Sequence, residues 1–144
     1  MEILMMKNIL VGQATEPYSA AIDRCGRLLV DSGYIKERYI QGMHERDKNL
    51  STAIGNYIAI PHGEKQYKED ILHTGISVLA YPEGLDWAGE KVYLVIGIAG
   101  KGEEHLDILA NIVEKLETGE DVLRLAQGGE PEVIYRLLAA GEAV

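Results

Sequence analysis

The chain has 144 residues and a formal net charge of -9, and 47% of its residues are hydrophobic and 26% charged. This length and balance are typical of one soluble domain with a buried core, so we expect residues 1–144 to form a single domain. The negative charge disfavours sequence-independent binding to nucleic acid or anionic lipid, because like charges repel. It would suit a transient partner with a basic face, although its simplest role is to keep the protein soluble.

Cysteine and hydropathy indicate the compartment. Cys25 is the only cysteine of the chain, so no internal disulfide can form, which points to the reducing cytosol. It lies in an apolar stretch, which favours a buried structural thiol over a nucleophile. No apolar run approaches the ~18 residues that a membrane-spanning helix needs. We therefore expect a cytoplasmic protein.

Apolar spacing in the first half of the chain predicts a strand, two helices and a second strand in turn. The first helix is expected to begin near Pro17, which the first helical turn tolerates, and to end at Gly33. The expected segments are a strand over Ile9–Val11, helices over about residues 17–32 and 36–48, and a strand over Tyr57–Ile60.

The second half opens with patterns that indicate neighbouring strands. Leu72–Tyr81 alternates and is rich in residues that favour strands. A turn is predicted at residues 82–84 (Pro-Glu-Gly), with a short edge strand over Leu85–Trp87 after it. Val92–Ala99 is apolar almost throughout, which predicts a central strand covered by helices on both faces.

The rest of the chain is helical in pattern. Helices are predicted over Glu103–Glu117, Asp121–Ala126 and Glu132–Ala140. The connections mix lengths that suit hairpins with lengths that suit crossovers. We therefore expect an α/β fold with a single mixed β-sheet of four or five strands, flanked by helices on both faces.

One stretch, Gly55–Gly63, places a histidine directly after an apolar run. Pro61 cannot donate to a sheet ladder, and Gly63 allows a turn or the close approach of another molecule. His62 is therefore expected at the carboxyl end of a strand, where α/β proteins commonly keep their sites. A surface histidine beside a turn explains the local pattern equally well.

Two further side chains are candidates for the same site. His105 is expected in the first turn of a helix, where unpaired N–H groups and a partial positive charge suit an anion. A lone histidine in a first helical turn most often has no functional role. If the strands that precede His62 and His105 are neighbours in the sheet, however, the two side chains could face one another. Arg46 has the planar fork of donors that clamps phosphoryl or carboxylate groups, although lone surface arginines are common.

Other chemistry is less well supported. No pair of the four histidines has zinc-ligand spacing, so no metal is expected. Residues 97–102 have the order G-x-x-G-x-G, which does not match a nucleotide-binding loop, so no cofactor is expected. Three residues can add hydrogen bonds to the site or simply stabilise turns and strand ends: Ser51, Thr52 and Asn56. The remaining histidines are interpreted as structural: His44 and His73.

Gly55–Gly63 (Gly-Asn-Tyr-Ile-Ala-Ile-Pro-His-Gly) resembles the active-site motif of mannitol/fructose-type enzyme IIA domains of the bacterial sugar phosphotransferase system. Residues 45–48 (Glu-Arg-Asp-Lys) and 104–106 (Glu-His-Leu) are similar to the arginine and second-histidine segments of that family. Residues 81–84 and 95–99 resemble the mannitol branch. A nitrogen-related regulatory enzyme IIA shares the Ile-Ala-Ile-Pro-His-Gly core, so the core alone does not distinguish the branches.

The resemblance implies a phosphocarrier with catalytic His62, His105 and Arg46. A histidine-containing phosphocarrier protein would donate a phosphoryl group to His62, which would pass it to a cysteine of an enzyme IIB domain during sugar uptake, with mannitol the favoured sugar. Arg46 would balance charge, and His105 would hold a phosphoryl oxygen or orient His62. Neither a metal nor a nucleotide is implied, because the donor is already a phosphohistidine. The alternative is a regulatory enzyme IIA whose phosphorylation state controls partner proteins.

Overall fold

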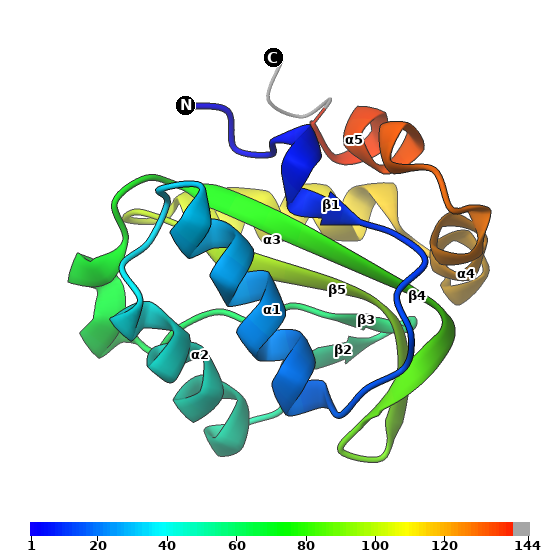
Figure 1. The fold of residues 1–144 in the computed structure, drawn as a ribbon, viewed down its shortest axis with the longest axis horizontal. Helices are drawn as coiled ribbons and strands as arrows, with labels where there is room; N and C mark the ends of the chain where they lie inside the picture. The colour runs from blue at the N-terminus through cyan, green and yellow to red at the C-terminus, as the bar shows by residue number, and fades with distance from the viewer. Residues whose placement is uncertain (140–144) are drawn as a thin grey trace.

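The computed structural model describes residues 1–139, which form one mixed five-stranded sheet with helices on both faces (Figure 1). The strands are β1 (Ile9–Leu10), β2 (Ala53–Gly55), β3 (Ile58–Ala59), β4 (Gly75–Trp87) and β5 (Glu90–Ala99). Their order across the sheet is β1-β4-β5-β3-β2. The β1–β4 and β3–β5 pairs are parallel, and the β4–β5 and β2–β3 pairs are antiparallel. The predicted fold class is confirmed.

The helices lie close to their predicted positions. They are α1 (Tyr18–Asp31), α2 (Arg38–Asn49), α3 (Glu104–Lys115), α4 (Gly119–Gly128) and α5 (Pro131–Ala139), with short 3-10 helices η1 (Met6–Asn8) and η2 (Lys65–Asp70). The last helix was predicted to reach Ala140, which lies outside the described residues. Among the helices of residues 1–139, none is both long and apolar enough to cross a membrane.

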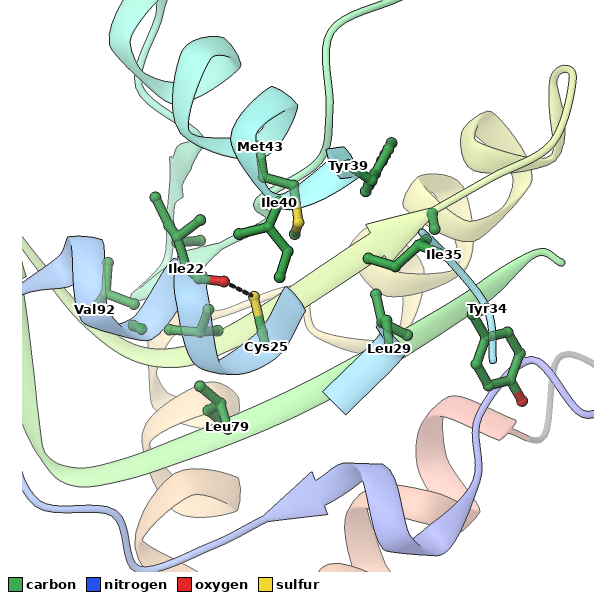
Figure 2. Close-up of a cluster of buried hydrophobic side chains, with 14 of the residues drawn as sticks. Ile22, Cys25, Leu29, Tyr34, Ile35, Tyr39, Ile40, Met43, Leu79 and Val92 are labelled. Atoms are coloured by element: carbon green, nitrogen blue, oxygen red, sulfur yellow. Dashed lines mark hydrogen bonds between the residues drawn. The ribbon is translucent and has the colours of Figure 1, made fainter. Parts of the chain in front are cut away.

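α1 and α2 cover one face of the sheet and enclose the first of two apolar cores (Figures 1 and 2). Figure 2 shows Cys25 of α1 among the apolar side chains of this core, where its thiol donates to the Ile22 carbonyl oxygen at 3.3 Å. Burial raises the pKa of Cys25 to about 12, so the thiol stays protonated. Cys25 is therefore buried, as predicted, and chemically inert.

The second core lies on the opposite face, beneath α3, α4 and α5. β5 contributes to both cores: Val92 and Val95 face the first, whereas Leu94 and Ile96 face the second. This burial on both faces confirms that the apolar run of residues 92–99 is a central strand. The loop after β5 therefore follows a strand that is buried on both faces.

The segment around Pro82 differs from the prediction. It does not turn the chain; β4 is one strand with a register irregularity between Ala80 and Leu85, and Gly84 has a φ of 74°. Such a bulge accommodates a proline that cannot donate to the ladder, while β5 pairs with β4 on either side of it. The turn comes at Ala88 and Gly89, whose φ angles of 52° and 98° suit a two-residue hairpin.

β2 was not predicted. It pairs with β3 through a tight turn at Asn56 and Tyr57, whose φ angles are 51° and 66°. Positive φ is unfavourable for a tyrosine, so neighbouring structure must hold it. The Tyr57 carbonyl oxygen accepts from the N–H groups of Tyr93 and Leu94, at 2.8 and 3.1 Å. The hairpin is thus fixed to β5, and it delivers β3 in parallel register beside that strand.

Candidate active site

His62 lies just after β3, at the carboxyl end of the strand. Pairing with β5 extends one residue beyond the proline, as a parallel bridge between His62 and Ile98. Although Pro61 cannot donate, its carbonyl oxygen accepts from the Ile98 N–H at 2.8 Å. Pairing therefore continues past the proline, even though Pro61 itself cannot donate to the ladder. The histidine backbone is held against the central strand.

The orientation of the His62 ring follows from one hydrogen bond. Nδ1 lies 2.8 Å from the carbonyl oxygen of Ile60. A carbonyl oxygen can only accept, so Nδ1 carries the proton and the lone pair of the neutral ring is on Nε2. Nε2 is therefore the nucleophilic atom of the site.

The surroundings of His62 favour its neutral form. Its pKa is lowered, mainly because the ring is partly buried, and the charges of Arg46 and His105 lower it further. The bond to the Ile60 carbonyl oxygen and the nearby Glu64 carboxylate act in the opposite direction. The structure therefore brings Arg46 and His105 within electrostatic reach of His62.

His105 lies in the first turn of α3, which follows β5, the parallel neighbour of β3. Its Nδ1 lies 3.1 Å from the Gly102 carbonyl oxygen, so this ring too has its lone pair on Nε2 when neutral. The turn from β5 into α3 is tight: a Cβ atom at Gly100 would lie 2.5 Å from the His105 backbone nitrogen. Glycine at this position lets the helix start directly beside the strand end.

Arg46 lies in the last turn of α2, and its Nη1 donates to the Leu50 carbonyl oxygen at 2.6 Å. The next residue, Asp47, is buried. One oxygen of Asp47 accepts from the Thr52 N–H at 2.8 Å, the Thr52 hydroxyl at 2.6 Å and the Trp87 indole N–H at 3.0 Å. Through these hydrogen bonds, Asp47 connects the C-terminal end of α2, where Arg46 lies, with β4 and with the segment that leads into β2. Sequence reasoning missed this role.

Three of the weaker candidates stabilise turns. The Ser51 hydroxyl accepts from the Ala53 N–H at 3.2 Å, and the Asn56 amide donates to the Glu117 carbonyl oxygen at 3.0 Å. The N–H and the hydroxyl of Thr52 both donate to Asp47. These contacts match the structural interpretation of the three residues.

The other two histidines lie apart from these contacts. His44 contacts Asp23 of α1 at 2.6 Å, whereas His73 is exposed just before β4. Within residues 1–139, no three histidine, cysteine, aspartate or glutamate side chains gather as metal ligands.

Gly63 also lies against a buried tyrosine ring: a Cβ atom at Gly63 would lie 2.6 Å from Tyr39 Cε1. The Gly63 N–H donates to the Tyr39 hydroxyl at 2.8 Å. Sequence analysis did not single out Tyr39 within the helix expected over about residues 36–48. The available signal was its hydroxyl, because a buried tyrosine normally finds a hydrogen-bond partner.

The fold and the histidine site together define an enzyme IIA-type protein. The family model described as "Phosphoenolpyruvate-dependent sugar phosphotransferase system, EIIA 2" matches residues 2–141. The chain belongs to this family.

Within it, similar relatives are mannitol-specific phosphotransferase enzyme IIA components. That of Staphylococcus aureus is 39% identical over 99% of both chains. That of Bacillus subtilis is 42% identical and the match covers 92% of this chain and 93% of the relative. That of Halalkalibacterium halodurans is 46% identical over 85% of both chains.

Solved structures agree with this assignment. The crystal structure of IIA mannitol from Escherichia coli has a TM-score of 0.86 and 33% identity, and covers 93% of this chain and 97% of its own. The complex of enzyme IIAMTL and phosphorylated enzyme IIBMTL from the same organism has the same TM-score and identity, covering 93% and 95%. The nitrogen regulatory protein IIA-Ntr from Neisseria meningitidis shares the fold, with a TM-score of 0.79 at 20% identity over 95% of this chain and 97% of its own.

Proposed function

We propose that this chain is a phosphocarrier for mannitol uptake. His62 accepts a phosphoryl group from a histidine-containing phosphocarrier protein and passes it to a cysteine of an enzyme IIB domain. The observation that carries the proposal is the His62 ring, held through Nδ1 by the Ile60 carbonyl oxygen so that Nε2 has the lone pair. The names of the relatives and the Escherichia coli complex with phosphorylated enzyme IIBMTL support the sugar and the acceptor.

Both steps exchange one bond to phosphorus for another. The lone pair of His62 Nε2 attacks the phosphorus of the donor phosphohistidine; the donor N–P bond breaks and its electron pair returns to the donor ring. In the second step, a thiolate sulfur of enzyme IIB attacks, and the pair of the N–P bond returns to Nε2. Because the transferred group resembles metaphosphate, catalysis is mainly positioning and charge stabilisation.

Arg46 and His105 supply that stabilisation in the proposed mechanism. The Arg46 guanidinium neutralises charge on the phosphoryl oxygens. His105 lies in the first turn of α3, where the helix N-terminus also favours an anion. Neither residue forms a bond to phosphorus. Replacing either one should therefore change the rate of transfer but not the number of phosphoryl groups that the chain accepts.

Separate Arg46→Gln and His105→Ala variants are expected to slow single-turnover transfer by about 10- to 100-fold, because each removes one stabilising group. The final level of one phosphoryl group per chain is expected to be unchanged. Arg124→Gln is a matched control, because Arg124 forms exposed ion pairs with Glu120 and Asp121 on α4. Rates equal to that control would remove the two residues from the mechanism.

The pH profile provides an independent test. Since the pKa of His62 lies below its usual 6.5, the neutral ring predominates at pH 7 and above. The transfer rate is expected to change little from pH 8 to 7 and to fall with a midpoint below 6.5. The contribution of His62 to folding stability is likewise complete above 6.5 and lost as the pH falls through the lowered pKa, because the unfolded chain binds the proton more tightly. An NMR titration of His62 with a midpoint above 6.5 would contradict the lowered pKa on which this pH profile depends.

We further propose that residues 1–144 act as one cytoplasmic domain. The regulatory alternative, in which the phosphorylation state of His62 controls partner proteins, differs in its acceptor. Transfer from the phosphorylated chain to a mannitol enzyme IIB domain supports transport. Failure of that transfer, with phosphorylation of His62 intact, would favour regulation.

A further inference from the structure

A buried tyrosine hydroxyl lies where the pairing of the His62 segment with β5 ends, at the residue after His62. Tyr39 lies near the start of α2 and is only 3% exposed. Its hydroxyl accepts from the Gly63 N–H at 2.8 Å and donates to the Ile98 carbonyl oxygen at 3.1 Å. This one oxygen therefore joins α2, the end of β5 and the chain that leaves His62.

The position of the hydroxyl is unusual for a parallel pair of strands. The Ile98 N–H donates to the Pro61 carbonyl oxygen at 2.8 Å, as in a regular ladder. In such a ladder, the next bond would run from the Gly63 N–H to the Ile98 carbonyl oxygen. Here the Tyr39 hydroxyl connects those two groups. The backbone is thus held on both sides of His62, directly before it and through tyrosine after it.

The fit of Tyr39 leaves little freedom. Its ring lies against Gly63 so closely that a Cβ atom there would be 2.6 Å from Cε1. Burial raises the pKa of Tyr39 to about 12, so the hydroxyl keeps its proton and can donate to Ile98 at physiological pH. Both partners of the hydroxyl are backbone groups, whose positions depend directly on the strand and the turn.

We propose that Tyr39 is a positioning residue for phosphoryl transfer, whose hydroxyl fixes the backbone around His62 so that Nδ1 stays on the Ile60 carbonyl oxygen and Nε2 faces the partner protein. The effect on transfer rests on the proposed function, whereas the effect on the His62 ring does not. Tyr39 does not touch the phosphoryl group; it acts through His62.

Tyr39→Phe tests this directly, because it keeps the ring against Gly63 and removes only the hydroxyl. Nitrogen NMR of the His62 ring is expected to change from a single Nδ1–H tautomer to a mixture, and its pKa to rise towards 6.5 as the ring becomes more solvated. Single-turnover transfer is expected to slow about tenfold, since misplacing a reacting group is costly, with one phosphoryl group per chain still accepted.

Tyr81→Phe is the matched control. Tyr81 belongs to the same apolar core and is fully buried, but its hydroxyl bonds to Glu16 rather than to the His62 turn. It is expected to leave the His62 tautomer and the transfer rate within about twofold of the unmutated protein. A Tyr39→Phe variant that behaves like this control would overturn the proposal.

A second variant tests the same contact from the Gly63 side. Gly63→Ala keeps the hydroxyl but displaces the Tyr39 ring, and Gly128→Ala, with no atom within 4 Å of the added Cβ, is its control. Gly63→Ala is expected to give the same tautomer mixture and slower transfer, and an unchanged tautomer and rate would refute the positioning role. If the unmutated chain accepted no phosphoryl group, the proposed function would fail, while the tautomer would still decide the role of Tyr39.

Discussion

Replacing His62 with alanine is expected to abolish phosphoryl acceptance. Nε2 of this ring is the proposed attacking atom, and in the proposed mechanism Arg46 and His105 stabilise charge without bonding to phosphorus. The measurement is the intact mass of the chain after incubation with phosphorylated donor. The unmutated protein should gain one phosphoryl group, and His62→Ala should gain none at any incubation time.

The control for this experiment is His73→Ala, because His73 is exposed and lies before β4. It should be phosphorylated as fast as the unmutated protein. Circular dichroism of His62→Ala should show an intact fold, since the ring is only partly buried at a strand end. A gain of one phosphoryl group by folded His62→Ala would refute the proposed function.

The largest effect on stability is expected for Asp47→Ala. The change leaves the Thr52 N–H, the Thr52 hydroxyl and the buried Trp87 indole N–H without their shared acceptor. Each unsatisfied buried donor costs about 1–3 kcal/mol, and the hydroxyl can rotate to another acceptor, so we expect the free energy of unfolding to fall by about 3 kcal/mol. Urea unfolding followed by circular dichroism provides the measurement.

Two variants sharpen that result. Asp47→Asn keeps one acceptor oxygen and should lose less stability than the alanine variant. Asp121→Ala removes an exposed ion pair with Arg124 at 3.6 Å and should lose less than about 1 kcal/mol. Trp87 is the only tryptophan, so its fluorescence reports on this contact directly. Equal losses for Asp47→Ala and Asp121→Ala would show that the Asp47 hydrogen bonds contribute little.

The parts of the fold that follow from local periodicity were predictable from the sequence. The helices and the buried β5 have clear apolar patterns, because burial on one or both faces imposes a period on the sequence. β2 and the bulge in β4 were not predictable in this way. Their geometry depends on the neighbouring strands, which hold Tyr57 at a positive φ and keep Pro82 within a strand.

The same distinction applies to the candidate site. His62, Arg46 and His105 could be proposed from the sequence because they lie within short motifs that resemble a known family. Asp47 and Tyr39 were missed because their partners are distant in sequence: Trp87 is 40 residues from Asp47, and Ile98 is 59 residues from Tyr39. Nothing in a local pattern specifies which carbonyl oxygen a buried hydroxyl will reach.

The burial of the Cys25 thiol affects which groups can receive the phosphoryl group in the proposed transfer. The next carrier is proposed to be a sulfur atom, so a reactive thiol on this chain would compete for the phosphoryl group and divert it. Cys25 is fully buried, and a Cβ atom at Gly97 of β5 would lie only 2.8 Å from its sulfur. Held as a neutral thiol by burial, it is a poor nucleophile. In the proposed mechanism, Cys25 therefore does not compete with the partner's thiolate for the phosphoryl group on His62.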